Sequence, residues 1–244
     1  FGAIIVLILL FCGIFADKIA PCGMNEIHLA DRLEPPSKQY LLGTDQLGRD
    51  MLSRIIYGAR ISVIVGLAAT SISLAIATAI GVISGFLGGR LDMVMQRFID
   101  AFMAFPGLII LLTVMALVGR GMLQLILVMG ISGGIGASRI TRSAVIAIKE
   151  NMYVHAAKAI GVPNNTTIFR HILPNIMATL IVIFSTSVGG IIMAEASLSF
   201  LGFGLPPDVA SWGGMLSGEG RRYMEMAPLL AFWPGLALSL TVYG

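Results

Sequence analysis

The feature that most constrains this chain is a long apolar run without charge. Residues Ile61 to Phe86 contain no Asp, Glu, Lys or Arg, and a run of roughly 18 or more such residues is long enough to cross a bilayer as an α-helix. Across the chain, 57% of residues are hydrophobic and 12% are charged, against about 25% charged in soluble domains. Because a soluble fold must present a polar surface to water, we predict an all-α polytopic membrane protein.

The apolar segments predict about six transmembrane helices, with boundaries uncertain by about two to four residues. They cover residues 1–15, 61–86, 102–118, 122–136, 176–194 and 229–244. The run begins at Phe1, so we expect the first helix to be truncated. We divide the chain into residues 1–60, the first helix and an outer segment, and residues 61–244, a core of five helices. That core includes an inner loop at 139–175 and an outer loop at 195–228.

Basic residues predict the orientation in the membrane. The segments that follow the second and fourth predicted helices carry a net charge of +4, and all other segments together carry −1. Because Lys and Arg are concentrated in cytoplasmic loops, we expect the side after the second and fourth helices to be cytoplasmic. The outer segment and the 195–228 loop then face the other side.

The sequence lacks the residues that several classes of function require. The net charge is only +3 and no basic run occurs, so nucleic acid is not an expected partner. There is no phosphate-binding G-x-x-x-x-G-K-[ST] loop. The histidines (His28, His155 and His171) lie on separate segments, and Cys12 and Cys22 form no metal-type cluster. We therefore expect no catalytic residues, no metal site and no cofactor on this chain. A Cys12–Cys22 disulfide would require Cys12 to lie near the end of its helix.

Small residues recur at every fourth position along the predicted second helix. They are Ala69, Ser73, Ala77, Gly81 and Gly85. Small side chains on one helix face let another helix approach closely in lipid. We predict that this stripe is a helix-packing surface.

The outer segment before the second helix is predicted to hold a short amphipathic helix. Thr44 or Asp45 is a suitable N-cap, and the apolar residues share one face (Leu47, Met51, Leu52, Ile55 and Ile56). Such a helix would lie at the membrane surface. It either fills the space before the second helix or takes part in gating.

The inner loop, residues 139–175, reads as two short helices joined by a turn. Gly161 is a natural helix C-cap, and Asn164 or Asn165 is a suitable N-cap for a second helix. Pro174 then begins the next membrane helix at a position that tolerates a missing N–H. One face of the first short helix is apolar (Tyr153, Ala156, Ala157 and Ile160), with His155 and Lys158 pointing away. This face either packs on the chain's own helices or docks in a groove of a cytoplasmic partner.

The residues of this loop resemble a known motif. The stretch from His155 to Gly161 (HAAKAIG), followed by His171 to Asn175 (HILPN), is similar to the "EAA" loop of ABC-transporter permeases. The family usually has Glu where this chain has His155. Further similarity lies in residues 42–50 (LGTDQLGRD), 57–60 (YGAR), 195–202 (EASLSFLG) and 211–213 (SWG). Together these stretches resemble the "C" permease of dipeptide, oligopeptide and nickel importers.

The resemblance implies a type I ABC importer permease fold and a set of partners. The expected partners are a second permease subunit, two ATP-binding subunits, an extracytoplasmic substrate-binding protein and membrane lipid. ATP and Mg would bind the ATP-binding subunits. The loop that couples to them would comprise Tyr153, His155, Ala156, Ala157, Lys158, Ile160, Gly161, His171 and Pro174. Candidates for an outer gate or a binding-protein contact are Asp45, Arg49, Asp50, Glu195 and Trp212.

Glu195 has two interpretations, because an ionisable group at the end of a membrane helix is costly and often functional. Either it serves the outer gate or binding-protein contact, or it lies in headgroup water or caps the following turn. For the whole chain, the leading hypothesis is a peptide importer permease. The alternatives are the same architecture importing nickel or another small solute, a secondary transporter driven by an ion gradient, a membrane scaffold and a membrane enzyme. The nearly charge-free helices argue against the secondary transporter.

Overall fold

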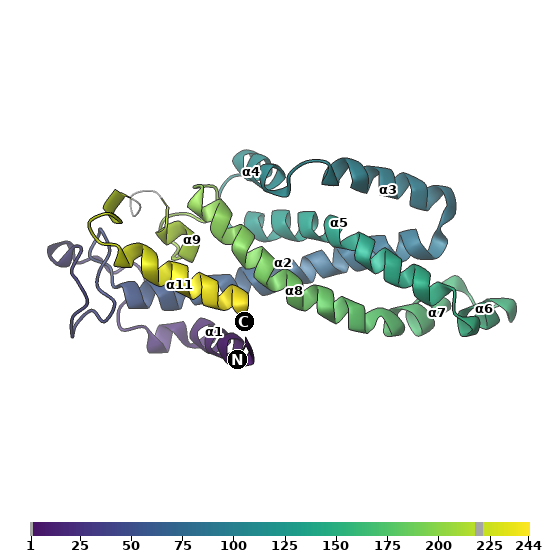
Figure 1. Cartoon of the computed structure of the whole chain (residues 1–244), viewed down its shortest axis with the longest axis horizontal. Helices are drawn as coiled ribbons and strands as arrows, with labels where there is room; N and C mark the ends of the chain where they lie inside the picture. The colour runs from purple at the N-terminus through teal and green to yellow at the C-terminus, as the bar shows by residue number, and fades with distance from the viewer. Residues whose placement is uncertain (1, 218–221) are drawn as a thin grey trace. The chain divides into compact units, whose positions relative to one another are not determined.

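The structure, a computed structural model, describes residues 2–217 and 222–244, most of which lie in helices (Figure 1). Phe1 of the predicted first span and residues 218–221 of the predicted outer loop lie outside the described residues. The α-helices are α1 (Gly2–Ile19), α2 (Met51–Leu87), α3 (Gly89–Met103), α4 (Gly107–Val118), α5 (Met122–Lys149), α6 (Met152–Ala159), α7 (Asn164–Thr167), α8 (Leu173–Phe200), α9 (Trp212–Met215) and α11 (Leu229–Tyr243). A 3₁₀ turn, η1, covers Leu29–Asp31, and a π-helical turn, η2, covers Ile168–Ile172.

Four of these helices are long and apolar enough to cross a membrane: α1, α2, α5 and the continuous α7–α8 segment. A fifth crossing results if α3 and α4 count as one span bent by 83°. The sixth predicted span corresponds to α11, which has 15 residues and is shorter than the roughly 20 residues of a full crossing. The all-α membrane fold is therefore confirmed, with a span count slightly below six.

The largest difference from the expected spans lies at residues 89–118. The predicted span 102–118 is split, because the chain leaves α3 after Met103 and begins α4 at Gly107. Pro106 explains the break: a proline disfavours helical backbone at the residue before it and lacks an N–H for the preceding turn. The 15-residue helix α3, which carries four charged residues, was not predicted as a helix.

The predicted short amphipathic helix near Thr44 is also wrong. Residues Thr44 and Asp50 instead pair in an isolated antiparallel bridge, and Gly48 takes a left-handed φ of 75°. That backbone conformation ends any helical turn between them. The helix begins only at Met51 and continues through Leu87 as α2. Asp50, not Thr44 or Asp45, accepts the Ser53 N–H at 2.8 Å at its start.

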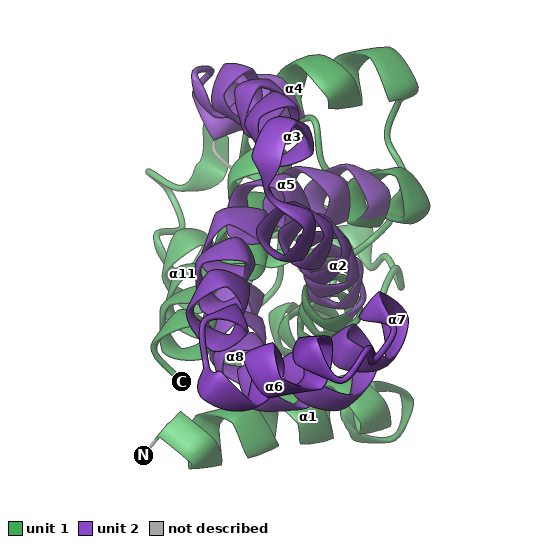
Figure 2. Cartoon of the chain, turned by 90° about the vertical axis from the view of Figure 1, so that its right-hand side faces the viewer, with its two compact units in different colours: residues 1–67, 112–126, 189–244 green, residues 68–111, 127–188 purple. Residues whose placement is uncertain are grey.

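The chain divides into two compact units, shown by colour in Figure 2. Unit 1 comprises residues 1–67, 112–126 and 189–244, and unit 2 comprises residues 68–111 and 127–188. The division of the sequence at residue 60, which follows membrane topology, remains a prediction. Cys12 and Cys22, both in unit 1, are free thiols.

In unit 2, α2 and α5 lie side by side through small residues (Figure 1). Ala69, Ser73 and Ala77 are buried. A Cβ on Gly81 would lie 2.6 Å from Cβ of Thr141, and one on Gly85 would lie 3.0 Å from Cβ of Val145. These distances leave no room for a larger side chain, so the stripe lies where α5 approaches α2 most closely.

Candidate functional site

The inner loop places one short helix, α6, directly after a break in the chain. Helix α5 ends at Lys149, and Asn151 takes an extended backbone conformation before Met152 starts α6. At the other end, Gly161 has φ of 80°, and Val162 N–H donates to the Ala157 carbonyl at 3.0 Å. This bond, with that from Gly161 N–H to the Lys158 carbonyl, is a Schellman C-cap. The bounds of the helix are thus fixed by its own sequence.

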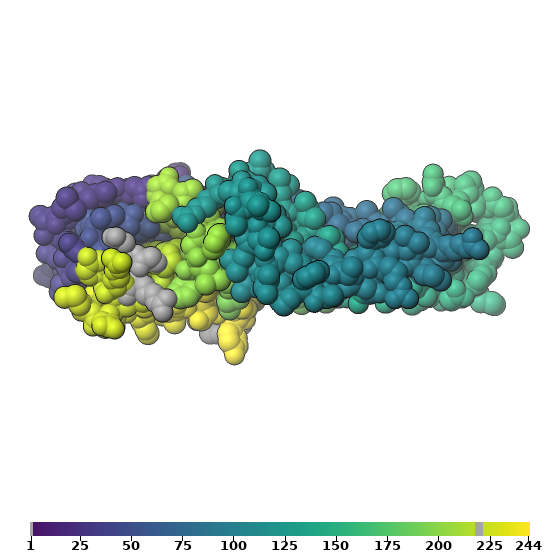
Figure 3. All heavy atoms as spheres, turned by 90° about the horizontal axis from the view of Figure 1, so that it is seen from above, coloured from purple at the N-terminus to yellow at the C-terminus, as the bar shows by residue number. Residues whose placement is uncertain are grey.

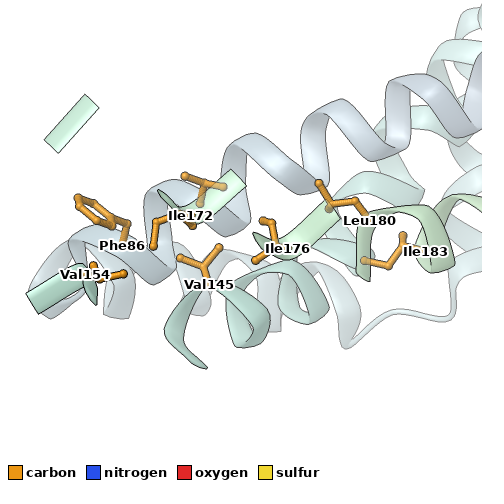
Figure 4. Packing of buried hydrophobic residues seen from close by; sticks show 8 residues of the cluster. Phe86, Val145, Val154, Ile172, Ile176, Leu180 and Ile183 are labelled. Carbon is orange, nitrogen blue, oxygen red and sulfur yellow. The ribbon is translucent and has the colours of Figure 1, made fainter. Parts of the chain in front are cut away.

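Helix α6 is anchored through one buried residue in particular. Val154 has no exposed surface and lies in a cluster of unit 2 with Phe86, Val145 and Ile172 (Figure 4). The ammonium group of Lys158 lies 5.0 Å from the centroid of the Phe86 ring, within the range of a cation–π contact. The cluster joins α6 to the ends of α2, α5 and α8.

The opposite face of α6 is exposed. Met152 and Ile160 are 88% and 81% exposed, and Phe169 in η2 is also exposed. The green α6–α7 segment forms this surface at the right of Figure 3. Beside it, a shallow hollow is lined by Asn165, Thr166, Phe169, Arg170 and Pro174.

The predicted apolar face of α6 is therefore divided by the structure. Ala157 is buried, whereas Tyr153, Ala156 and Ile160 are exposed. Lys158 does not point away but reaches back over Phe86. The cause is tertiary: Val154 and Ala157, three residues apart, form the buried side of the helix, so the face around Ile160 turns outward.

The two histidines of the loop lie near the surface of α6. His155 is exposed, with its Nε2 3.6 Å from a carboxylate oxygen of Glu150. The ring of His171 lies 6.3 Å from that of Tyr153 at a tilt of 55°. Pro174 lies in the first turn of α8, as its missing N–H allows. The predicted second helix is present as α7 and η2, but its N-cap is Pro163, without a side-chain cap.

The outer candidate residues are largely buried in unit 1. The carboxylate of Asp45 accepts the N–H groups of Leu47 and Arg49, at 2.8 and 3.0 Å, on one oxygen. Its other oxygen accepts Arg49 Nε at 2.6 Å and lies 3.8 Å from Arg54 Nε. Asp50 also accepts the hydroxyl of Ser53. This network folds the outer segment onto the start of α2.

Glu195 and Trp212 hold the outer loop against unit 1. Glu195 is 1% exposed, and its carboxylate accepts the Ser199 hydroxyl at 2.7 Å, so its placement in headgroup water is wrong. Trp212 Nε1 donates to the Ile55 carbonyl at 3.1 Å. A Cβ on Gly213 would overlap the backbone of Ala196. Helix α9 is therefore packed closely on α2 and α8.

Several residues at these sites were missed from the sequence. Val154 and Phe86 look like ordinary apolar residues, and only the fold shows that they anchor α6. Arg54 and Arg120 line a cavity in unit 1. Arg120 carried a signal, since it is a lone charge between Gly119 and Gly121 and two apolar segments.

Within residues 2–217 and 222–244, no group of three or more His, Cys, Asp or Glu side chains is placed to hold a metal ion. In unit 2, an ion pair joins Asp92 to Arg142 through two bonds of 2.6 and 2.7 Å. Asp92 also accepts the Ser84 hydroxyl. These bonds tie α3 to α5.

Several apolar helices with a surface-exposed loop helix anchored at their ends define a polytopic membrane protein. Residues 77–243 match the family described as binding-protein-dependent transport system inner membrane component. The chain belongs to this family.

Alignments with curated relatives extend over 99–100% of this chain. It is 37% identical over 243 residues to the oligopeptide transport system permease protein OppC of Bacillus subtilis, covering all of this chain and 79% of the relative. It is 36% identical to the glutathione transport system permease protein GsiD of Pectobacterium atrosepticum, covering 99% of this chain and 80% of the relative. It is 35% identical to the dipeptide transport system permease protein DppC of Alkalihalophilus pseudofirmus, covering 100% and 80%.

Membership fixes the general role of the chain. It is a multi-pass permease subunit of the cytoplasmic membrane of a prokaryote, and it works with an ATPase and a substrate-binding protein. The resemblance read from residues 155–175 and from the outer motifs is confirmed.

Proposed function

We propose that this chain forms half of the channel of an ATP-driven importer for peptides. A second permease subunit supplies the other half, two ATP-binding subunits bind on the cytoplasmic side, and an extracytoplasmic protein delivers the substrate. ATP and Mg bind the ATP-binding subunits. The basic residues that follow the second and fourth predicted spans support a cytoplasmic position for the 139–175 loop.

The observation that carries this proposal is the two-sided character of α6. One side, with Val154 and Phe86, is locked into the core of unit 2. The other side presents Met152 and Ile160 almost fully to the surroundings. Exposed large apolar groups beside polar ones are typical of a protein interaction surface. A helix held in this way transmits movement of a bound ATPase to α2, α5 and α8.

Transport follows from a change between two states with different affinities. Docked ATP-binding subunits that close on ATP favour one arrangement of the helices, and their release favours the other. The outer residues Asp45, Arg49, Asp50, Glu195 and Trp212 would then close the external end. Their burial and mutual hydrogen bonds favour a role in holding the outer loop rather than direct contact with the binding protein.

Peptides are the substrate class that the relatives support best. Their printed names specify oligopeptide, dipeptide and glutathione transport, and glutathione is itself a small peptide. Nickel import by the same architecture remains the alternative. A direct comparison of labelled dipeptides and nickel as cargo for the reconstituted importer distinguishes them.

The docking surface is tested by an Ile160→Asp substitution. Burying an unpaired carboxylate at an interface costs several kcal/mol, so the ATP-binding subunits should no longer purify with the tagged chain. Leu29→Asp is the matched control, because Leu29 is 68% exposed in unit 1 and lies outside the proposed docking surface. Full recovery of the ATP-binding subunits with Ile160→Asp would show that α6 is not the docking helix.

The outer gate is tested by Glu195→Gln, which keeps the shape of the side chain and removes its charge. If the carboxylate holds the outer loop through Ser199, uptake should fall while ATP-binding subunits are still recovered. Unchanged uptake would contradict the role of Glu195 in the gate.

A further inference from the structure

A cavity of about 580 Å³ lies entirely within unit 1. Its wall comprises the segment around Asp45 to Arg54, Arg120 in the turn between α4 and α5, the loop after Ser199, and Leu230 at the start of α11. By the distribution of basic residues, these segments face the outside. The volume lies within the roughly 300–1,000 Å³ typical of small-molecule sites.

Positively charged side chains outnumber negatively charged ones in the lining of this cavity. Three guanidinium groups, from Arg49, Arg54 and Arg120, face one carboxylate, from Asp45. That carboxylate already accepts hydrogen bonds from two backbone N–H groups and from the Nε–H of Arg49. Three guanidinium groups and one carboxylate give the wall a formal excess of positive charge, although Arg49 and Arg54 both lie within 4 Å of Asp45.

Arg54 and Arg120 differ in their surroundings. Arg54 is buried; its Nε lies 3.8 Å from the Asp45 carboxylate, and its Nη1 donates to the Met24 carbonyl at 3.3 Å and to Asn25 Oδ1 at 3.4 Å. Arg120 is exposed at the cavity, with its Nη2 beside Gly202, and forms no ion pair within the part of the chain that the structure describes. Asp50 and Glu195 are not among the residues that line the cavity, and their carboxylates accept the hydroxyls of Ser53 and Ser199.

The planar fork of an arginine suits a carboxylate, which accepts two parallel hydrogen bonds from it. The rest of the wall includes apolar residues such as Leu47, Leu205 and Pro206, which suit the side chains of a small solute. A buried arginine and an exposed one that line the same cavity give a site that is partly preformed and is completed by the ligand.

We propose that this cavity is an anion subsite that binds the C-terminal carboxylate of the transported peptide through Arg120, with Arg49 and Arg54 supplying the positive field behind it. The proposal rests on peptide import as the function of the chain. It makes this permease a participant in substrate selection at the outer face, in addition to the binding protein.

The test uses the complete importer in lipid nanodiscs, with the partner permease and ATP-binding subunits but without the binding protein. Equilibrium dialysis measures the binding of radiolabelled trialanine and of trialanine amide, which lacks the carboxylate. For the wild type, the acid should bind about tenfold more tightly than the amide, as expected for one charge-assisted hydrogen-bonded pair.

Arg120→Gln should abolish this preference by weakening the binding of the acid about tenfold while leaving the amide unchanged. Lys38→Gln, which removes an exposed cation of unit 1 that does not line the cavity, should keep the preference. Equal binding of the two probes to the wild type, no binding of either, or a preference that survives Arg120→Gln would overturn the proposal.

A parallel measurement of transport distinguishes failure of the anion-subsite proposal from failure of the proposed peptide-import function. Wild-type importer with its binding protein, in proteoliposomes loaded with ATP, should accumulate trialanine. Uptake without any acid preference in dialysis refutes the subsite alone, whereas absence of ATP-driven uptake of any peptide refutes peptide import. If Arg120→Gln instead lowers only the affinity for the loaded binding protein, the carboxylate belongs to that protein and the subsite proposal is wrong.

Discussion

Replacing Val154 with alanine should loosen α6 without altering the surface that it presents to a partner. Val154 has no exposed surface and lies against Phe86, Val145 and Ile172 (Figure 4). The substitution removes two buried carbon atoms, at about 0.8 kcal/mol each. The residual cavity adds to this loss, so we expect the anchored state of α6 to lose about 2 kcal/mol.

That loss changes the population of α6 detached from the core. Since 1.4 kcal/mol corresponds to a factor of ten, about 2 kcal/mol raises the detached fraction about 30-fold. A detached α6 still carries Met152 and Ile160, so it should still bind the ATP-binding subunits. It should no longer pull on α2, α5 and α8, and ATP hydrolysis should become uncoupled from transport.

The assay is the number of ATP molecules hydrolysed for each peptide imported into proteoliposomes. We expect this ratio to rise for Val154→Ala while the ATP-binding subunits are recovered in full. Val182→Ala is the matched control, because it makes the same chemical change at a position that is 61% exposed on α8. A ratio equal to that of the control, or loss of the ATP-binding subunits, would refute the anchoring argument.

Two further predictions concern the packing of unit 2 and the outer segment of unit 1. Gly81→Val should prevent α5 from approaching α2, because a Cβ at Gly81 would already lie 2.6 Å from Cβ of Thr141. The yield of folded protein in detergent should fall sharply, whereas Gly136→Ala, at a site with nothing within 4 Å, should be tolerated. Normal folding of Gly81→Val would contradict the packing. Tyr40 donates a 2.7 Å hydrogen bond to the Asp31 carboxylate, which raises the pKa of Tyr40 from 10.0 to about 12. The bond therefore stabilises the outer segment fully below pH 10, and its contribution is lost as the pH rises through 12. The difference in tyrosinate absorbance between the wild type and Tyr40→Phe reports the ionisation of Tyr40 and should titrate near pH 12. Titration of that difference near pH 10 would contradict the bond.

The sequence predicted the membrane helices well where apolar runs were long. The predicted 61–86 and 176–194 spans lie inside α2 and α8, because a long uncharged run has no other stable structure in lipid. The predicted 102–118 span failed at Pro106. Hydropathy averages over a window, so it does not register the backbone restriction that one proline imposes.

The site could be located from the sequence but not oriented. The resemblance of residues 155–175 placed the loop, and Gly161 marked the end of α6. Helical periodicity then grouped Ala157 with Ile160, although the former is buried and the latter is exposed. In a helix of only eight residues, the buried face depends on which side meets the ends of the long helices, and that is tertiary information.

The hydrogen-bond network around Asp45 and the cavity of unit 1 could not be predicted from the sequence, for a different reason. Asp45, Arg49 and Arg54 come together through a left-handed turn at Gly48, and Arg120 joins them from a segment far along the chain. No local pattern encodes that juxtaposition, which exists only after the outer segment folds onto unit 1.

The central claim is that this chain moves peptides by coupling to ATP hydrolysis through its inner loop. The most direct test is peptide uptake into proteoliposomes that contain the chain, its partner permease and the ATP-binding subunits, with the loaded binding protein outside. We expect accumulation of labelled peptide only when ATP is enclosed, and no dependence on an imposed proton or sodium gradient. Accumulation driven by an ion gradient without ATP would contradict the account and favour a secondary transporter.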